Sequence, residues 1–254
     1  MTEAMMNTLF AGTLPLSVTE HGAGPTTFLL LHGGAGPDSM LGLAESLATT
    51  SRVVVPTHPG FAGTLRPERF VRIDDLVLAY LALLDAVDAT NVVVVGNSFG
   101  GWLAAEIALR GSPRVAKIAL LNAVGIASGD RPIVDPTTLP VSERAAYSFH
   151  DPARFAAKLV LPDNLRHMPA NMAALRLYAG TPFMHDPTLE GRLAALAVPA
   201  LVLWGESDRI VDETYGRRFA ASMPGARFIL VPEAGHFPHL ERADDVTGHL
   251  RALV

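Results

Sequence analysis

The sequence predicts an α/β fold with a mostly parallel central β-sheet flanked by helices. Several short apolar runs are rich in β-branched residues or leucine and do not alternate with polar residues, which is typical of strands buried on both faces. Helical patterns, with apolar residues spaced by three and four, lie between these runs. Strands that alternate with helices form βαβ units, which build parallel sheets with right-handed crossovers.

Each apolar run that is bounded by turn residues is expected to form a strand of the parallel sheet. These runs are residues 27–31, 53–55, 91–95, 117–121, 200–204 and 227–231. The earlier segment 14–22 alternates better between apolar and polar residues, and we expect it to form an antiparallel strand at the edge of the sheet.

The expected helices follow the same order along the chain. Residues 73–87 place Leu76, Tyr80, Leu83, Leu84 and Val87 on one stripe, as the buried face of a helix requires. Further helical patterns cover residues 101–110, 212–223 and 243–253. Each of them follows one of the predicted strands, so the pattern supports a parallel sheet.

Residues 126–197 interrupt this alternation. They contain no convincing strand, but Asp151-Pro152 and Asp186-Pro187 each pair a capping acid with a proline at the first helical position, and Ser142-Glu143 opens another short helix. The segment is too apolar to stay disordered. We therefore expect a helical insertion over the sheet, with residues 1–125 and 198–254 forming the core domain.

Composition excludes several classes of function. The chain has 254 residues, a formal net charge of −5 and no cysteine, which removes disulfides, thiol catalysis and cysteine-based metal sites. It shows no Lys/Arg cluster of the kind that binds nucleic acid and no apolar run of the roughly 18–20 residues that cross a membrane. The N-terminus does not resemble a signal peptide. We expect a cytoplasmic monomer or homodimer that acts on a small molecule, without a nucleic-acid or membrane partner.

The pentapeptide Gly96-Asn97-Ser98-Phe99-Gly100 fits the G-x-S-x-G pattern, and it lies between a predicted strand and a predicted helix. A sharp turn there would hold Ser98 in a strained backbone conformation above the N-terminus of the helix, where N–H groups and the helix dipole favour negative charge. The flanking glycines are needed because a Cβ at those positions would make strand and helix collide. Ser98 is therefore the candidate nucleophile.

A serine hydroxyl needs a base, and the base needs an acid that orients it. Asp208 lies in the turn after the predicted strand 200–204, and His236 lies in the loop after the strand 227–231. The chain order serine, acid, histidine is the order expected for hydrolases with this motif. Asp212 is an alternative acid, but we expect it to cap the next helix.

These motifs resemble those of the α/β-hydrolase-fold superfamily across essentially the whole chain. The resemblance rests on LLLHGGAG at 29–36, THPGFAGT at 57–64, GNSFGG at 96–101, and the pair WGESD and AGHFPHLE. It implies that residues 126–197 form a helical cap, inserted after the sixth strand. It also implies no cofactor and no metal.

The resemblance further assigns an oxyanion hole and a substrate pocket. The two N–H donors would come from Gly34 and Phe99, while His32 would be buried and structural. The residues expected at the substrate are Gly33, Gly34, Phe99, Tyr147, Tyr178 and Phe237. The arginines of the cap are expected to be mostly solvated, although one of them could bind a substrate carboxylate; these are Arg131, Arg144, Arg154, Arg166 and Arg176.

A serine nucleophile favours acyl transfer, and our first interpretation is a hydrolase of small carboxylic esters or lactones that acts through an acyl-enzyme. GNSFGG is also similar to the elbow of meta-cleavage-product C–C hydrolases, but those enzymes tend to carry tryptophan after the histidine, where this chain has Phe237. Ligand receptors and cofactor-free oxygenases of the same fold also keep the three residues, so both remain open alternatives.

Overall fold

The computed structural model describes residues 2–9, 12, 14–136, 138–159 and 162–254. Its centre is an eight-stranded sheet with the strand order β1-β2-β4-β3-β5-β6-β7-β8. The strands from β3 to β8 run parallel, whereas β2 is antiparallel to both β1 and β4. The strands are β1 (Thr2–Leu9), β2 (Leu14–His21), β3 (Thr27–Leu31), β4 (Arg52–Pro56), β5 (Val92–Asn97), β6 (Val115–Leu121), β7 (Ala200–Gly205) and β8 (Arg227–Val231).

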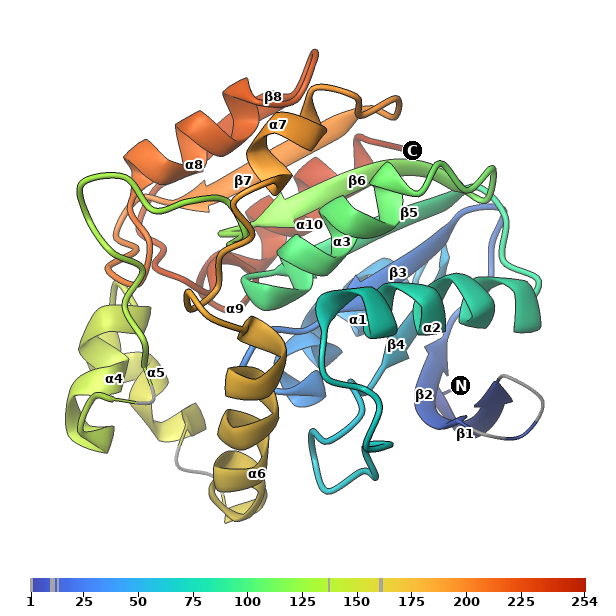
Figure 1. Ribbon diagram of the computed structural model, residues 1–254, viewed down its shortest axis with the longest axis horizontal. Coiled ribbons are helices and arrows are strands. Elements are labelled where there is room, and N and C mark those ends of the chain that lie inside the picture. Colours follow the sequence, from blue (N-terminus) through green and yellow to red (C-terminus); the bar gives the residue numbers. More distant parts are fainter. Residues whose placement is uncertain (1, 10–11, 13, 137, 160–161) are drawn as a thin grey trace.

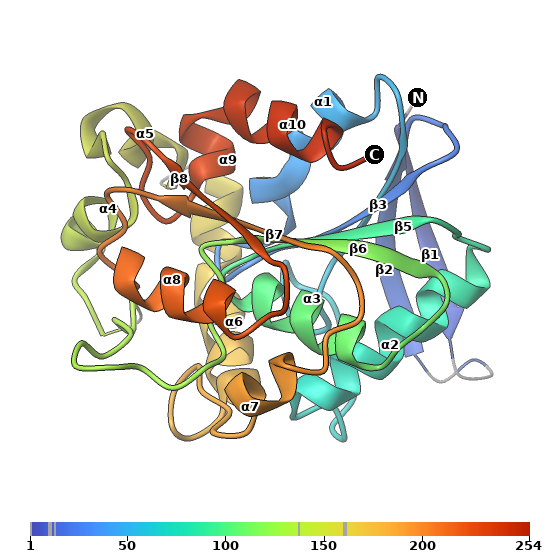
Figure 2. The same cartoon turned by 90° about the horizontal axis from the view of Figure 1, so that it is seen from above.

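Helices cover both faces of this sheet, as Figure 2 shows. On one face lie α1 (Leu41–Leu47) and α10 (Ala243–Arg251), with the short elements η1 (Pro37–Met40) and α9 (Pro238–Glu241) nearby. On the other face lie α2 (Ile73–Ala86), α3 (Phe99–Leu109) and α8 (Glu213–Ala221). The prediction of a mostly parallel sheet flanked by helices is therefore confirmed.

Alternate residues of the central strands feed two separate apolar cores. In β3, Leu29 and Leu31 join the core beneath α2 and α3, whereas Phe28 and Leu30 join the core beneath α1 and α10. All four side chains are fully buried. Burial on both faces explains why these strands read as continuous apolar runs in the sequence.

The structure corrects the prediction at the start of the chain. The segment 14–22 forms β2 and is antiparallel as expected, but β1 pairs with it on the outside and takes the edge of the sheet. Strand β1 has no strong sequence signal, because residues 2–9, TEAMMNTL, lack the β-branched or alternating pattern on which the prediction depended.

The expected cap segment, residues 126–197, contains α4 (Val141–Ser148), α5 (Pro152–Leu159), α6 (Pro162–Ala179) and α7 (Leu189–Leu193). Figure 1 shows α4, α5 and α6 together beyond the carboxyl ends of the central strands. In contrast, α7 lies beside the core, where Arg192 makes a bidentate ion pair with Glu106 of α3.

Two of the predicted helix starts in this segment are confirmed and one is wrong. Helix α5 begins at Pro152, and the Asp151 carboxylate accepts a hydrogen bond from the backbone N–H of Arg154 at 3.1 Å. Helix α4 spans the predicted Ser142-Glu143 start. Asp186-Pro187 does not open a helix, because α7 begins only at Leu189 and Asp186 instead binds the N–H of Thr188 in a turn.

Candidate active site

Ser98 occupies a strained turn between β5 and α3. Its backbone has φ 55° and ψ −116°, a left-handed conformation that non-glycine residues rarely adopt. Such a conformation costs about 1–3 kcal/mol and persists only where the surrounding structure enforces it. Here the N–H of Ser98 donates to Leu121 O of β6 at 2.9 Å, and its carbonyl accepts from Gly101 N of α3 at 2.9 Å, so β6 and α3 both hold the turn.

The two glycines of the motif permit this turn for different reasons. A Cβ added to Gly96 would lie 2.0 Å from the carbonyl oxygen of Gly100, so strand and helix would collide there as predicted. A Cβ on Gly100 would instead lie 2.1 Å from the carbonyl oxygen of Leu31, in the neighbouring strand β3. The second glycine therefore allows α3 to pack against the sheet.

Asp208 and His236 meet at the carboxyl ends of β7 and β8. His236 Nδ1 lies 2.8 Å from Asp208 Oδ2, and both residues are buried. The other carboxylate oxygen, Oδ1, accepts N–H groups from Ile210 at 2.8 Å and Val211 at 3.2 Å. Since a carboxylate accepts from Nδ1, the ring carries its proton there and leaves Nε2 free to accept one.

The alternative acid Asp212 has a different role. It is the N-cap of α8, and its carboxylate accepts the backbone N–H of Tyr215 at 3.0 Å. This capping role matches the expectation from the sequence. The structure therefore pairs His236 with Asp208.

Two asparagines support this arrangement, and the sequence analysis did not assign them these contacts. Asn122 donates its side-chain amide to Asp208 Oδ2 at 2.7 Å and accepts the N–H of Gly205 at 3.1 Å. Asn97 donates to the carbonyl of His236 at 2.9 Å. Both are fully buried polar residues at the carboxyl end of a buried strand, and that position is a signal that sequence reading could have used.

The loop that follows β3 is held by a buried network of neutral side chains. His32 Nδ1 donates to Gly33 O at 2.8 Å, while its Nε2 accepts the N–H of His58 at 3.1 Å. His58 in turn donates from Nε2 to His32 O at 2.8 Å and bonds through Nδ1 to the hydroxyl of Tyr80. Burial lowers the pKa of His32 to about 4, which keeps its ring neutral.

Burial extends to several histidines of the core. His32 is fully buried, as the resemblance implied. His58, His239 and His21 are buried as well. Their burial arises from tertiary packing that a local sequence pattern does not report.

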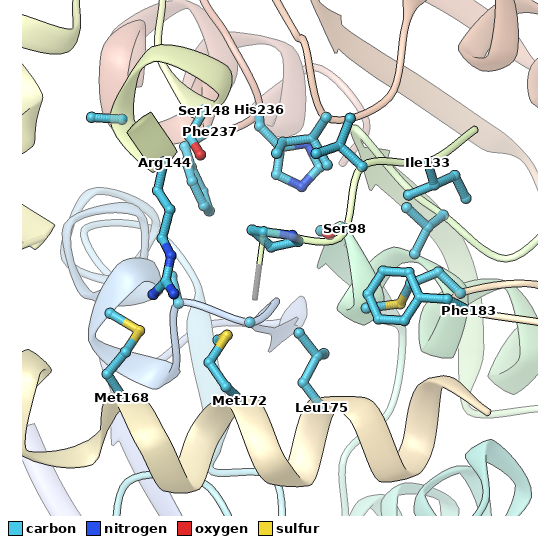
Figure 3. A pocket seen from close by; sticks show the side chains of 18 of the residues that line it. Ser98, Ile133, Arg144, Ser148, Met168, Met172, Leu175, Phe183, His236 and Phe237 are labelled. Atoms are coloured by element: carbon cyan, nitrogen blue, oxygen red, sulfur yellow. The ribbon is translucent and has the colours of Figure 1, made fainter. Parts of the chain in front are cut away.

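A cavity of about 260 Å³ opens in front of Ser98. Ser98 and His236 both line it, and Figure 3 shows their side chains on the wall opposite α6. The core contributes Gly34, Ala35, Ser98, Val124, Ile210, His236 and Phe237 to the lining. The segment 126–197 contributes Ile133, Val134, Pro136, Ser142, Arg144, Ala145, Ser148, Met168, Met172, Leu175, Phe183 and Met184.

The structure brings only some of the expected substrate-contacting residues to this cavity. Gly34 and Phe237 line it, whereas Gly33, Phe99, Tyr147 and Tyr178 do not. The ring of Phe99 packs behind the turn against Tyr178, whose hydroxyl donates to the carbonyl of Pro59 at 3.1 Å. These aromatic residues lie in the region that the sequence indicated. A local sequence pattern does not distinguish a side chain that packs in the interior from one that lines a cavity.

The two expected oxyanion donors differ in what the structure shows of their surroundings. Phe99 is the first residue of α3, so its N–H has no acceptor within the helix. Gly34 lies on the cavity wall, and a Cβ there would fall 2.8 Å from Leu175 Cδ2, the flexible end of a side chain of α6.

Helix α4 is hydrogen-bonded to both loops that carry the Asp208 and His236 side chains. The N–H of His236 donates to Ser148 O at 2.7 Å, and the N–H of Arg209 donates to Tyr147 O at 3.2 Å. The carboxylate of Glu241 accepts N–H groups from His150 at 2.9 Å and from Gly235 at 2.6 Å. The α4–α5 turn is therefore fastened to the histidine loop.

Within the described part of the chain, the His, Asp and Glu side chains form no cluster of three or more that could hold a metal ion. The same residues include no helix with the length and hydropathy needed to span a bilayer.

The fold and the site together define a class of protein. A mostly parallel eight-stranded sheet carries a serine on a strained strand-to-helix turn, with an acid and a histidine after later strands, which is the arrangement of the α/β-hydrolase fold. The sequence matches the alpha/beta hydrolase family over residues 28–248, and the chain belongs to this family. Membership supports a hydrolase.

Individual relatives are distant. The chain is 27% identical to the dihydrolipoyllysine-residue acetyltransferase component of an acetoin cleaving system from Pseudomonas putida, over 92% of this chain but 64% of that protein. It is also 27% identical to a 2-hydroxy-6-oxononadienedioate/2-hydroxy-6-oxononatrienedioate hydrolase from P. putida, over 91% of this chain and 88% of that one. A thermophilic esterase from Thermogutta terrifontis superposes with a TM-score of 0.80 at 20% identity, covering 99% of this chain and 97% of that one.

Proposed function

We propose that this protein is a serine hydrolase that cleaves a carboxylic ester or lactone of a small molecule through an acyl-enzyme. The observation that carries the proposal is the shared cavity: Ser98, on its strained turn, borders the same space as His236, whose Nδ1 is bonded to Asp208 at 2.8 Å. Residues 126–197 act as the cap that closes this space.

Acylation follows from these positions. Ser98 Oγ attacks the ester carbonyl while His236 Nε2 accepts the hydroxyl proton, and Asp208 stabilises the resulting imidazolium. The N–H groups of Gly34 and Phe99 stabilise the negative charge that forms on the carbonyl oxygen by donating hydrogen bonds to it. A donor of this kind lowers the barrier by roughly 3–4 kcal/mol.

Acylation is completed when the tetrahedral intermediate collapses and the leaving alcohol takes the proton from His236. Deacylation repeats the same proton transfers with water in place of the serine hydroxyl. Water then attacks the acyl ester on Ser98, with His236 again accepting a proton, and releases the carboxylic acid while restoring the serine hydroxyl.

The lining of the cavity supports a small acyl group. Apart from Ser98 and His236, most of the lining is aliphatic, aromatic or methionine, and the volume is about 260 Å³. Such a site binds an apolar chain by removing it from water, while a few polar groups orient the substrate.

The test is turnover of p-nitrophenyl acetate, butyrate and octanoate by the wild type beside Ser98→Ala. We expect release of p-nitrophenol that disappears in the variant, while circular dichroism and thermal unfolding show that the variant is folded. Turnover that persists in Ser98→Ala would contradict serine chemistry. The preferred chain length measures the depth of the cavity.

A second candidate is hydrolysis of a C–C bond next to a carbonyl. It is favoured by the relative named as a 2-hydroxy-6-oxononadienedioate hydrolase, which aligns over 91% of this chain. Loss of the absorbance of a meta-cleavage dienoate by the wild type, without turnover of the esters, would select this reaction. Loss of neither substrate would favour a ligand receptor, or a cofactor-free oxygenase if dioxygen is consumed with an aromatic heterocycle.

A further inference from the structure

The cavity contains one side chain that its apolar lining does not explain. Arg144 extends from α4 into the cavity, and Figure 3 shows its guanidinium beside Met168 and Met172 of α6, across from Ser98. Among the residues that line this cavity, no other carries a permanent charge. A cation at this position changes which substrates the cavity can accept.

The structure holds the guanidinium by one of its edges only. Arg144 Nε donates to the carbonyl of Leu139 at 3.2 Å, which orients the planar group. In the described ranges, Arg144 makes no ion pair with a carboxylate. The terminal nitrogens are thus available to an anion inside the cavity.

The other arginines of this segment are engaged elsewhere or point to solvent. Arg176 pairs with Asp135 at 3.2 Å, and Arg192 pairs with Glu106 and Asp186. Arg166 is exposed on α6 and does not line the cavity. Arg144 therefore differs from Arg166, Arg176 and Arg192 in lining the cavity, and unlike Arg176 and Arg192 it makes no ion pair with a carboxylate of the described residues.

We infer that Arg144 is a specificity-determining residue that binds a carboxylate carried by the substrate, at a position remote from the bond that is cleaved. A guanidinium presents two parallel N–H donors that match a carboxylate. A half-buried cation among methionines is only partly hydrated, so an anion that replaces the remaining water gains both charge and hydrogen-bond energy. The chain itself carries a net charge of −5, so the attraction is local to the cavity.

This inference rests on the proposed function and names its substrate class. The acyl part would be a half-ester of a dicarboxylic acid, or another acyl compound with a free carboxylate, with the apolar chain along α6. The simpler reading is that the Arg144 stem only covers apolar surface while its head stays in water. That reading predicts no dependence on substrate charge.

The test compares two substrates that differ in one charge. Mono-p-nitrophenyl adipate carries a free carboxylate, and methyl p-nitrophenyl adipate is its neutral counterpart. We expect the wild type to prefer the anion. Arg144→Met should lower kcat/KM for the anion about 10- to 100-fold, mainly through KM, and leave the neutral ester within about twofold, since hydrogen bonds to charged groups contribute about 1.5–3 kcal/mol. Arg166→Met, at an exposed position of the cap, should behave like the wild type.

Equal loss for both substrates in Arg144→Met would show a structural role, and the absence of any loss would also overturn the inference. If neither ester is hydrolysed, the proposed function fails, and the charge preference is judged by calorimetry with monomethyl and dimethyl adipate. Tighter binding of the anion, abolished in Arg144→Met, would still support the carboxylate site. Equal binding, or none, would contradict it.

Discussion

The two walls of the cavity are built in opposite ways. On the core wall, hydrogen bonds fix each reactive group: Asp208 holds His236, Asn122 holds Asp208, and Asn97 ties the serine turn to the histidine loop. On the cap wall, Met168, Met172 and Leu175 of α6 project into the space through apolar side chains. Under the proposed function, the core would supply the chemistry and the cap would select the substrate.

The two parts of the cap wall, α4–α5 and α6, are attached to the core in different ways. The turn between α4 and α5 is bonded to the histidine loop through Glu241 and Ser148. Helix α6 is instead bonded to the loop after β4, through Asn171 and Tyr178, and it faces the cavity with apolar side chains. Changes at the α4–α5 turn should therefore reach the histidine loop, whereas changes in the side chains of α6 that face the cavity should alter only the fit of the substrate. The following experiments test this contrast.

The largest effect is expected at the core wall. Asp208→Asn should lower kcat about 10⁴-fold, because an amide in place of the carboxylate favours the wrong tautomer of His236. The rate of p-nitrophenyl butyrate hydrolysis measures this. Asp212→Asn, which changes only the cap of α8, should keep at least about a third of wild-type activity; the reverse pattern would show that we have paired the wrong acid with the histidine.

The buried histidines of the core should make stability depend on pH. Burial lowers the pKa of His32 to about 4 and, with the nearby His236, that of His239 to about 3, from a usual 6.5. Below pH 6.5 the unfolded chain therefore binds protons that the folded chain does not, and stability falls as the pH falls. Each such histidine contributes about 1.4 kcal/mol per pH unit once its unfolded form is protonated.

Urea unfolding between pH 7 and pH 5 checks this prediction, because most carboxylates remain ionised over that range. The free energy of unfolding should be constant near pH 7 and should decrease increasingly steeply below pH 6.5. A free energy that stays flat down to pH 5 would mean that the histidines are not held neutral in the folded core.

An intermediate effect is expected where the cap is fastened to the core. Glu241→Gln replaces an acceptor oxygen with an amide donor that faces the N–H groups of Gly235 and His150. We expect a loss of about 2 kcal/mol in the free energy of unfolding, because hydrogen bonds to a charged group contribute about 1.5–3 kcal/mol. Amide hydrogen exchange should accelerate at residues 146–151 and 234–236 together.

The matched control is Glu213→Gln, which removes an exposed ion pair with Arg217 on α8. Its cost should be about 0.3–0.5 kcal/mol. If Glu241→Gln costs no more than this control, or if exchange accelerates in only one of the two segments, the turn is not fastened to the histidine loop in the way described.

The smallest effect is expected on α6. Met172→Ala enlarges the cavity without touching a hydrogen bond, so kcat/KM should shift toward the longer p-nitrophenyl esters by about 3- to 10-fold, with Ser98 reactivity unchanged. Leu177→Ala, at a partly exposed position on the same helix, should leave the preference as it is. A uniform loss for every chain length would show that α6 positions the reactive groups after all.

The sequence predicted the core better than the cap for a physical reason. Strands buried on both faces leave continuous apolar runs, and the turn at Ser98 requires glycines at fixed positions, so both are visible locally. The pairing of His236 with Asp208 was inferred from chain order. The position of β1, in contrast, depends on its pairing with β2 and leaves only a weak local pattern.

The cavity lining could not be read from local patterns in the same way. Tyr178 and Met172 lie on one helix, but one packs behind the serine turn and the other faces the cavity, and this depends on how α6 is placed. Arg144 was one of several cap arginines with similar surroundings in the sequence. Only the three-dimensional arrangement distinguishes it from Arg166 or Arg176.

The most direct test of the account is covalent labelling with a p-nitrophenyl alkylphosphonate, which a serine nucleophile attacks with loss of p-nitrophenolate. We predict one adduct per chain by intact mass, located on Ser98 by peptide mapping, absent from Ser98→Ala and formed much more slowly by His236→Ala. An adduct on another residue, or no adduct on the folded wild type, would contradict the assignment of Ser98 as a nucleophile activated by His236.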